Sequence, residues 1–312
     1  MTETTKTVFE KYEIRKTKKQ KTAFIEYVQT VAKENGYACT VESDKKSVRN
    51  IVIGSPEKAK VIYTAHYDTC PVMPFPNFIT PKNFLIYLLY QLLVTVIFML
   101  VPAFAMQYLS QMIFTAAGID PTLSLWVFEI TLFSILFFIM FGPANKHTAN
   151  DNTSGVTALL DLMIAMPEEL RANAAFVFFD CEETGLVGSS AFAKKHKEAH
   201  LKPLVNFDCV SDGNHILFAM RKDAVTYASM LKEAFPENES CKVEILSKGV
   251  FYPSDQAKFK KGIGVAALKK SKHGGILYMD RIHTKHDTVY REENIDFLTK
   301  GAIRLTEIMS NT

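Results

Sequence analysis

The chain has 312 residues, a formal net charge of +3 and a hydrophobic fraction of 48%. A net charge this small excludes a broad basic surface, so we expect no nucleic-acid partner. The five cysteines are odd in number and show no paired spacing, which argues against a disulfide framework and favours a reducing compartment. Residues 1–21 are polar and basic, unlike a signal peptide.

Residues 8–35 are predicted to form a helix, because apolar side chains recur there at helical spacing. Gly36 is the expected stop of this helix. The basic run from Arg15 to Lys21 is interpreted first as a solvated helix face. Attraction of this run to anionic lipid is the alternative.

A short apolar strand is predicted at residues 61–65, and His66 and Asp68 follow it. A histidine followed two residues later by an aspartate suggests a metal ligand and a carboxylate that orients its ring. A purely structural histidine is the alternative.

Two apolar stretches interrupt the pattern of a soluble domain. Residues 83–119 contain no charged side chain, and residues 84–109 exceed the roughly 20 apolar residues that cross a bilayer. The second stretch, residues 123–141, carries only Glu129, which we expect to be protonated or to face the partner helix. Pro102 is expected to kink the first helix.

We interpret residues 83–145 as a transmembrane helical hairpin, inserted between residues 1–82 and 146–312 of a catalytic domain. Lys82 and Lys146 flank the hairpin, whereas its connecting loop has no lysine or arginine. Positive flanks mark the cytoplasmic side, so we expect the catalytic domain in the cytoplasm. A soluble apolar lid or a dimerisation hairpin is the alternative.

The continuous apolar run at residues 176–179 is typical of a strand that is buried on both faces. Glu182 and Glu183 follow it, and then a turn that contains glycine. Ligands bind outside the carboxyl ends of strands in open α/β sheets. Neighbouring glutamates at that position can divide metal binding and proton transfer between them. A solvated loop pair is the alternative interpretation.

The rest of the chain alternates between predicted strands and helices, which indicates an α/β fold with a mixed, largely parallel sheet. Asp151 precedes a predicted helix, and helix capping alone would explain it. Asp208 follows a predicted strand at 203–207, and His283 lies in a polar loop after a strand at 276–278. Further strands are expected near 216–219, 243–246 and 263–268, and helices over 191–197, 224–234 and 292–309.

Five candidate ligands therefore follow or adjoin predicted strand ends. They are His66, Asp151, Glu183, Asp208 and His283. Imidazole and carboxylate ligands suit zinc, and two histidines with three carboxylates suit two zinc ions that share one bridging carboxylate. Glu182 remains as the general base.

In these motifs the sequence resembles the dizinc aminopeptidases of metallopeptidase family twenty-eight, relatives of bacterial leucyl aminopeptidase and glutamate carboxypeptidase. The matching motifs are His66-Tyr67-Asp68, Asp151-Asn152-Thr153-Ser154-Gly155, Glu182-Glu183-Thr184-Gly185-Leu186-Val187-Gly188-Ser189, Asn206-Phe207-Asp208, Ser254-Asp255 and His283-Thr284-Lys285-His286-Asp287-Thr288. They occur in the family's order and, apart from the hairpin, cover about residues 55–310. The resemblance implies a three-layer zinc-exopeptidase fold.

The resemblance also implies a role for each residue. His66 and Asp208 would hold one zinc ion, Glu183 and His283 the other, and Asp151 would bridge them. Asp68 would orient His66, and Glu182 would pass a proton from the attacking water to the leaving amine. His286 is a weaker rival to His283, which occupies the ligand position of the motif.

The sequence departs from the family pattern at three places. The link between the first two motifs is short in relatives, whereas here it holds the apolar hairpin, which would bring the mouth of the site close to the membrane. Gln256 follows Asp255, where relatives often have histidine. Ile282 precedes the last ligand, so no tyrosine assists the oxyanion from that position, and Tyr252 is a candidate substitute.

The predicted function is that of a two-pass zinc aminopeptidase of the cell membrane, with a peptide substrate and the lipid bilayer as partners. A related zinc amidohydrolase or dipeptidase is the second interpretation. A non-catalytic, membrane-anchored binding protein of the same fold is the third, although none of the expected ligands is missing.

Overall fold

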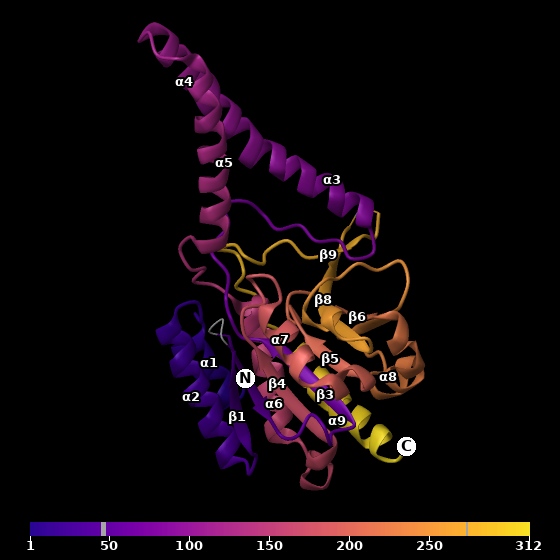
Figure 1. The fold of residues 1–312 in the computed structure, drawn as a ribbon. Helices are drawn as coiled ribbons and strands as arrows, with labels where there is room; N and C mark the ends of the chain where they lie inside the picture. The colour runs from indigo at the N-terminus through magenta and orange to yellow at the C-terminus, as the bar shows by residue number, and fades with distance from the viewer. Residues whose placement is uncertain (45–47, 273) are drawn as a thin grey trace.

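The computed structural model describes residues 1–44, 48–272 and 274–312. Within them, nine strands form one mixed sheet in the order β1-β2-β4-β3-β5-β8-β6-β7, with β9 paired to β8 (Figure 1). The strands are β1 (Cys39–Ser43), β2 (Arg49–Ile53), β3 (Val61–His66), β4 (Ala174–Phe179), β5 (Leu204–Phe207), β6 (His215–Met220), β7 (Lys242–Leu246), β8 (Gly262–Lys270) and β9 (Leu277–Tyr278). The predicted mixed α/β fold is confirmed.

The centre of the sheet is parallel. Strand β3 pairs in parallel with β4 and β5, and β5 pairs in parallel with β8. Every residue of β3, β4 and β5 is buried, which explains why these strands are continuous apolar runs. Their carboxyl ends share one edge of the sheet, and the loops that follow carry the candidate ligands.

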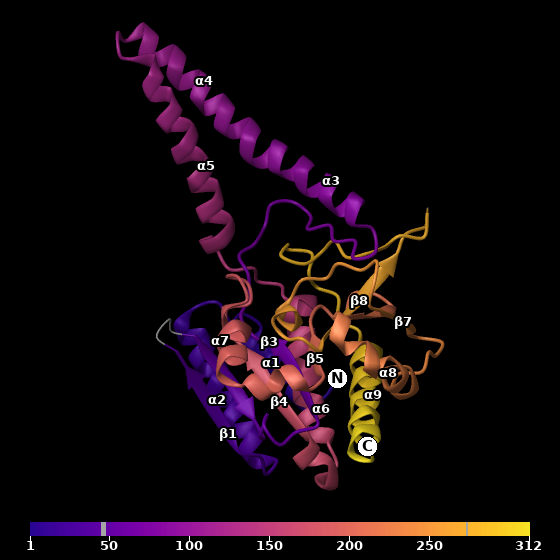
Figure 2. The same ribbon diagram turned by 45° about the vertical axis from the view of Figure 1, so that its right-hand side comes forward.

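Helices cover both faces of the sheet, as seen in two views (Figures 1 and 2). They are α1 (Glu3–Tyr12), α2 (Lys18–Glu34), α6 (Gly155–Ala165), α7 (Val187–Lys195), α8 (Ala228–Ala234) and α9 (Glu292–Ser310). Alternate residues of β4 serve the two layers, because successive side chains of a strand point to opposite faces. Phe176 and Phe178 join the core with α2, α6 and α9, whereas Val177 and Phe179 join Phe192 of α7.

The N-terminal segment differs from the single helix expected at residues 8–35. Helix α1 ends at Tyr12, and α2 begins after Thr17, whose side chain forms a capping box with Gln20. The expected stop holds, since α2 ends just before Gly36, whose φ is +78°. Strands β1 and β2, which pair antiparallel at the edge of the sheet, were not predicted.

The basic run Arg15–Lys21 contains a buried residue. Neither a solvated helix face nor a lipid-binding surface therefore describes every residue of the run. Arg15 is 0% exposed. Its guanidinium donates to the carbonyl oxygens of Tyr12 and Tyr67, both at 2.6 Å, and burial lowers its pKa to about 10. Lys21 pairs with Asp180 at 2.5 Å. These two cations therefore join the N-terminal segment to the central part of the sheet instead of facing water or lipid.

Arg15→Met is expected to lower the free energy of unfolding by about 3 kcal/mol, because it leaves several buried carbonyl oxygens without a donor. Lys19→Met, at an exposed position of the same run, is the matched control and should change it by less than about 0.5 kcal/mol. Thermal unfolding in detergent measures both variants. Equal midpoints for the two would show that Arg15 does not anchor this segment.

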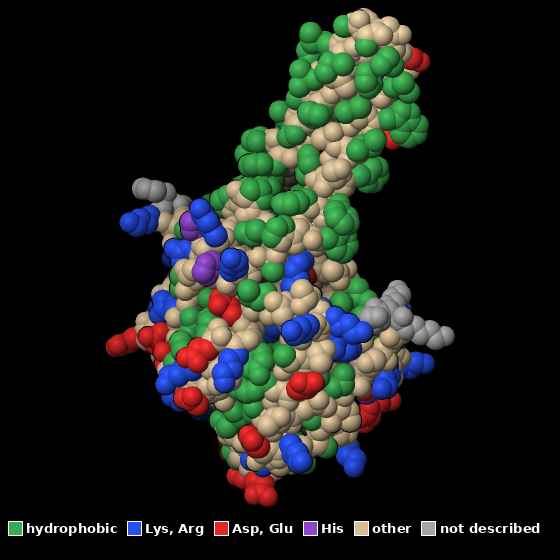
Figure 3. All heavy atoms as spheres, turned by 90° about the vertical axis from the view of Figure 1, so that its left-hand side faces the viewer, with side chains coloured by type: hydrophobic (Ala, Val, Ile, Leu, Met, Phe, Trp, Pro, Cys, Tyr) green, Lys and Arg blue, Asp and Glu red, His purple; other side chains and the backbone are tan. Residues whose placement is uncertain are grey.

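The apolar insertion forms two long helices that project from the sheet domain (Figures 1 and 2). They consist of α3 (Phe84–Thr95), a π-helical segment (Val96–Leu100) and α4 (Val101–Ala116), followed by α5 (Ser124–Phe141). The spans Phe84–Ala116 and Pro121–Phe141 are long and apolar enough to cross a membrane. Hydrophobic side chains make up much of the hairpin surface on the face shown in Figure 3. The first helix continues beyond the expected end at residue 109, and the π-helical segment lies just before Pro102.

Of the two expectations for Glu129, contact with the partner helix is not seen. Its side chain is exposed, and within the described residues it forms no hydrogen bond or ion pair. The contact between α4 and α5 is apolar instead, with the rings of Phe104 and Phe128 at 4.9 Å.

Aromatic side chains join the base of the hairpin to the sheet domain. The ring of Phe251 contacts the rings of Phe84 and Tyr87 in α3. Phe75, in the loop before the hairpin, contacts Phe98 with ring centroids 4.5 Å apart. The hairpin is therefore joined both to the loop that follows His66, through Phe75, and to the segment after β7, through Phe251.

Candidate metal centre

Three of the five candidate ligands lie at the carboxyl ends of the central strands, and the other two lie in loops that reach the same edge. His66 is the last residue of β3, Asp208 directly follows β5, and Glu183 lies in the turn after β4. Asp151 lies in the turn that precedes α6, and His283 follows β9. Parallel strands bring their ends to one edge, so residues from distant parts of the chain meet there.

The carboxylate of Asp151 lies between the two histidines. Its Oδ1 is 3.3 Å from Nε2 of His66, and its Oδ2 is 2.8 Å from Nε2 of His283. The same nitrogen of His66 is 3.5 Å from Oδ1 of Asp208, and that of His283 is 3.4 Å from Oε2 of Glu183. The side chains therefore form two three-residue groups that share Asp151.

Backbone hydrogen bonds hold Asp151 in this position. Asp287 accepts hydrogen bonds from the backbone N–H groups of Asn150 and Asp151, at 2.7 and 2.9 Å. Asn152 donates to the carbonyl oxygens of His66 and Phe207, at 3.3 and 3.0 Å. The turn is thus joined to β3, to β5 and to the His283 loop. Asp287 was not predicted to have a role.

Asp68 positions the turn with Glu182 and Glu183 more directly than it orients the ring of His66. Its carboxylate accepts hydrogen bonds from the backbone N–H groups of Glu182 and Glu183, at 2.9 and 3.2 Å. From His66, Nδ1 lies 3.7 Å from that carboxylate but 3.2 Å from the carbonyl oxygen of Asp68. Asp68 therefore connects the candidate ligand His66 with the turn that carries Glu183.

Three residues in or beside the site have a left-handed backbone. Cys181 before Glu182, Cys209 after Asp208, and His283 itself have φ between 57° and 61°. This conformation costs a non-glycine residue about 1–2 kcal/mol, so the surrounding contacts must hold it in place. Such strain is concentrated at functional sites, which agrees with the position of these three residues.

Buried negative charge dominates the centre. Burial, with Asp151 nearby, raises the pKa of Glu183 to about 8, although His283 opposes the shift. Burial lowers the pKa of His283, but Glu183 and Asp151 outweigh it and raise the value to about 10. The pKa of His66 is also raised. Burial lowers it, but the nearby carboxylates of Glu182, Asp151 and Asp208 outweigh that effect. The centre therefore favours bound positive charge.

The donor set fits divalent cations. Oε1 of Glu183 and Nδ1 of His283 are buried and have no hydrogen-bond partner within the described residues. Two imidazoles and three carboxylates at these separations are ligand types that zinc accepts. Cations there would offset the buried carboxylates, which would otherwise have to take up protons.

Glu182 lies beside the ligands as a further carboxyl group. Burial raises its pKa well above the usual range, and the nearby Asp255 and Asp208 add to the shift while His66 opposes it. Asp255 is fully buried, and burial raises its pKa to about 7. The site thus contains two further carboxyl groups, those of Glu182 and Asp255, whose pKa values are raised by burial.

Three further residues lie around the ligand cluster or in the loop beyond it. His286 is exposed in the loop beyond His283. The hydroxyl of Tyr252, proposed above to assist the oxyanion, donates to the carbonyl oxygen of Asp208 at 3.0 Å and so holds a candidate ligand. Cys70 was not predicted, yet its sulfur, Glu183 and His283 offer ligand atoms within 4.8 Å of one another.

Comparison with solved structures shows the fold. The chain is 14% identical to a Zn-dependent exopeptidase from Parabacteroides distasonis, with a TM-score of 0.56, covering 99% of this chain and 98% of that one. The LapA aminopeptidase of Legionella pneumophila is 14% identical, with a TM-score of 0.55 and coverages of 97% and 69%. A glutaminyl cyclase from Porphyromonas gingivalis is also 14% identical, with a TM-score of 0.57 and coverages of 97% and 98%.

A comparison with curated proteins gave no match. The model of Peptidase family M28 matches residues 135–304. That segment contains Asp151, Glu183, Asp208 and His283, and the structure adds His66 from the part before the hairpin. The match covers more than half of the residues of this chain, so the chain belongs to peptidase family M28.

Proposed function

We propose that this chain is a zinc-dependent aminopeptidase with a two-metal centre. The observation that carries the proposal is the position of Asp151, whose two carboxylate oxygens face two separate histidines at 3.3 and 2.8 Å. A carboxylate shared in this way suits a pair of metal ions about 4 Å apart. His66 and Asp208 would hold one ion, and Glu183 and His283 the other.

Zinc bound by these residues would lower the pKa of a water molecule and polarise the scissile carbonyl group. Glu182 would take a proton from the attacking water and deliver it to the leaving amine. Its raised pKa supports this role, because a more basic carboxylate accepts a proton from water more readily. Asp68 would keep the catalytic turn in place through its two backbone hydrogen bonds.

Paired substrates test the proposed activity. The purified protein with zinc should release the first residue of Leu-Ala-Ala but leave its N-acetylated form intact, and a chelator should abolish turnover. Cleavage of the acetylated peptide would indicate the amidohydrolase alternative instead. A peptide that begins with glutamine separates hydrolysis, which releases glutamine, from cyclisation, which releases ammonia. Peptide binding without any turnover would favour the non-catalytic alternative.

We further propose that the two helices span a membrane and that the catalytic domain lies on its cytoplasmic side. The spans are long, apolar and exposed, and hydrophobic side chains cover the projecting hairpin (Figure 3). Lys82 and Lys146 lie at its base, whereas the loop between the spans has no lysine or arginine. The lipid bilayer would then lie close to the mouth of the site.

Alkaline carbonate extraction tests the spanning model. The intact protein should remain in the membrane pellet, whereas a variant in which residues 84–141 are replaced by a short polar linker should enter the supernatant. Release of the intact protein would favour a soluble apolar lid.

Orientation needs a separate label. A cysteine at Ala116, in an otherwise cysteine-free chain, should react with an impermeant maleimide added outside intact cells. Reaction only after lysis would place the loop in the cytoplasm and contradict the proposed topology.

A further inference from the structure

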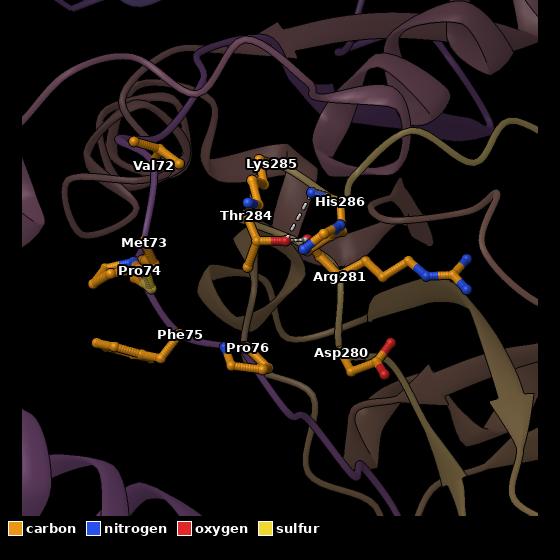
Figure 4. Close-up of a pocket in the computed structure, with 10 residues that line it drawn as sticks. All are labelled: Val72, Met73, Pro74, Phe75, Pro76, Asp280, Arg281, Thr284, Lys285 and His286. Carbon is orange, nitrogen blue, oxygen red and sulfur yellow. Dashed lines mark hydrogen bonds between the residues drawn. The ribbon is translucent and has the colours of Figure 1, made fainter.

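A pocket beside the metal centre has one apolar wall and one polar wall (Figure 4). Its volume is about 500 Å³, which is enough for one or two amino-acid residues. Residues 72–76 form the apolar wall, and residues 280, 281 and 284–286 form the polar wall. The candidate ligand His283 belongs to the same loop as the polar wall, yet it does not line the pocket.

The pocket adjoins the reacting end of the site. The backbone N–H of Met73 donates to the carbonyl oxygen of His283 at 2.7 Å, so the apolar wall is fixed to a candidate ligand. Thr284 directly follows that ligand and lines the polar wall. Phe75 contacts Phe98, which supports the apolar wall from the hairpin side. A substrate held at the metal centre therefore has this pocket next to it.

One positive charge in the pocket is not neutralised. Asp280 pairs with Lys269, and Arg281 pairs with Asp212 at 3.1 Å. In Figure 4 the side chain of Arg281 extends away from the apolar wall. Lys285 lines the pocket and is exposed, and it forms no ion pair within the described part of the chain.

We propose that this pocket binds the leaving side of the substrate and that Lys285 binds a carboxylate there. The apolar wall would hold an apolar side chain, while the lysine contacts the negative group. Lys285 lies two residues after His283, at most about 7 Å along the backbone, so a carboxylate one residue beyond the scissile bond is within reach. The carboxylate is either the C-terminus of a short peptide or an acidic side chain. This inference rests on the proposed aminopeptidase activity.

Three peptides distinguish the two sources of the carboxylate: Leu-Leu, Leu-Leu amide and Leu-Glu amide. Wild-type kcat/KM for Leu-Leu should exceed that for Leu-Leu amide by about tenfold, the effect of one charge-assisted hydrogen bond. The difference should lie in KM, because the contact is made equally in the bound substrate and in the transition state. The kcat/KM for Leu-Glu amide should match that for Leu-Leu if an acidic side chain can bind Lys285. It should match that for Leu-Leu amide if only the C-terminal carboxylate fits.

Lys285→Met should abolish the preference for the carboxylate, whereas Lys19→Met, which removes an exposed charge elsewhere, should leave it unchanged. Calorimetry with a reduced-bond Leu-Leu analogue and its amide measures the same preference without turnover. A preference in binding that Lys285→Met removes supports the pocket even if the protein hydrolyses no peptide. Wild-type protein that treats acid and amide alike, or a preference that survives in Lys285→Met, overturns the inference while leaving the proposed activity intact.

Discussion

Glu182→Gln is expected to lower kcat by about 10²–10⁴-fold while zinc content stays at the wild-type value. The amide has nearly the shape of the carboxyl group but cannot accept a proton from water. The side chain is not among the five ligands, so metal binding should survive. Its turn is held by Asp68 through backbone N–H groups, which the substitution leaves in place.

Metal analysis and turnover must be measured on the same preparation. Glu198→Gln, at an exposed position, is the matched control and should behave as wild type. Wild-type kcat/KM should fall at acid pH, because protonation of Glu182 removes the base, and the residual activity of Glu182→Gln should lack that dependence. Near-normal turnover in a variant with full zinc content would remove Glu182 from the role of base.

Asp151→Ala should abolish measurable turnover, a loss of at least about 10⁴-fold, because both ions and the water they activate depend on this residue. Zinc content should fall for both sites. Glu183 belongs to only one of the two ligand groups. Glu183→Ala should therefore retain the ion that His66 and Asp208 would hold. The contrast between these variants therefore tests the bridge and separates it from a general loss of stability.

Asp223→Ala, at an exposed position, controls for loss of a carboxylate and should keep both zinc content and activity. His66→Ala and His283→Ala should each lower zinc content by one ion. Asp151→Ala protein that still holds two zinc ions would contradict the bridging assignment.

The centre of the fold could be predicted because burial leaves a direct mark on the sequence. Strands β3, β4 and β5 are buried on both faces and therefore appear as uninterrupted apolar runs. Polar residues directly after such runs must lie at one edge of a parallel sheet, so the shared edge of His66, Glu183 and Asp208 could be predicted. The hairpin was equally visible, because residues 83–119 lack charges over a length that no ordinary surface helix tolerates.

The edge of the sheet could not be predicted in this way. Strand β1 is only partly buried and contains Thr40, Glu42 and Ser43, so its composition does not differ from that of a loop. Arg15 was assigned to a solvated face because its neighbours in sequence are lysines. Its burial depends on carbonyl oxygens of Tyr12 and Tyr67, and local composition carries no record of such tertiary acceptors.

Supporting residues of the site escaped prediction for a similar reason. Asp287 acts on the backbone N–H groups of residues 150 and 151, which lie more than a hundred positions away in the chain. The left-handed conformations of Cys181, Cys209 and His283 are uncommon for residues other than glycine, so the surrounding structure must maintain them. Candidate ligands are recognisable by residue type and position, whereas the contacts that hold them depend on the fold.

Native mass spectrometry of the wild-type protein, titrated with zinc in detergent, tests the central claim most directly. The proposed centre predicts two bound zinc ions per chain, and Asp151→Ala should bind neither in the same concentration range. Saturation of the wild-type protein at a single ion, or two ions bound equally well by Asp151→Ala, would contradict a centre built around Asp151.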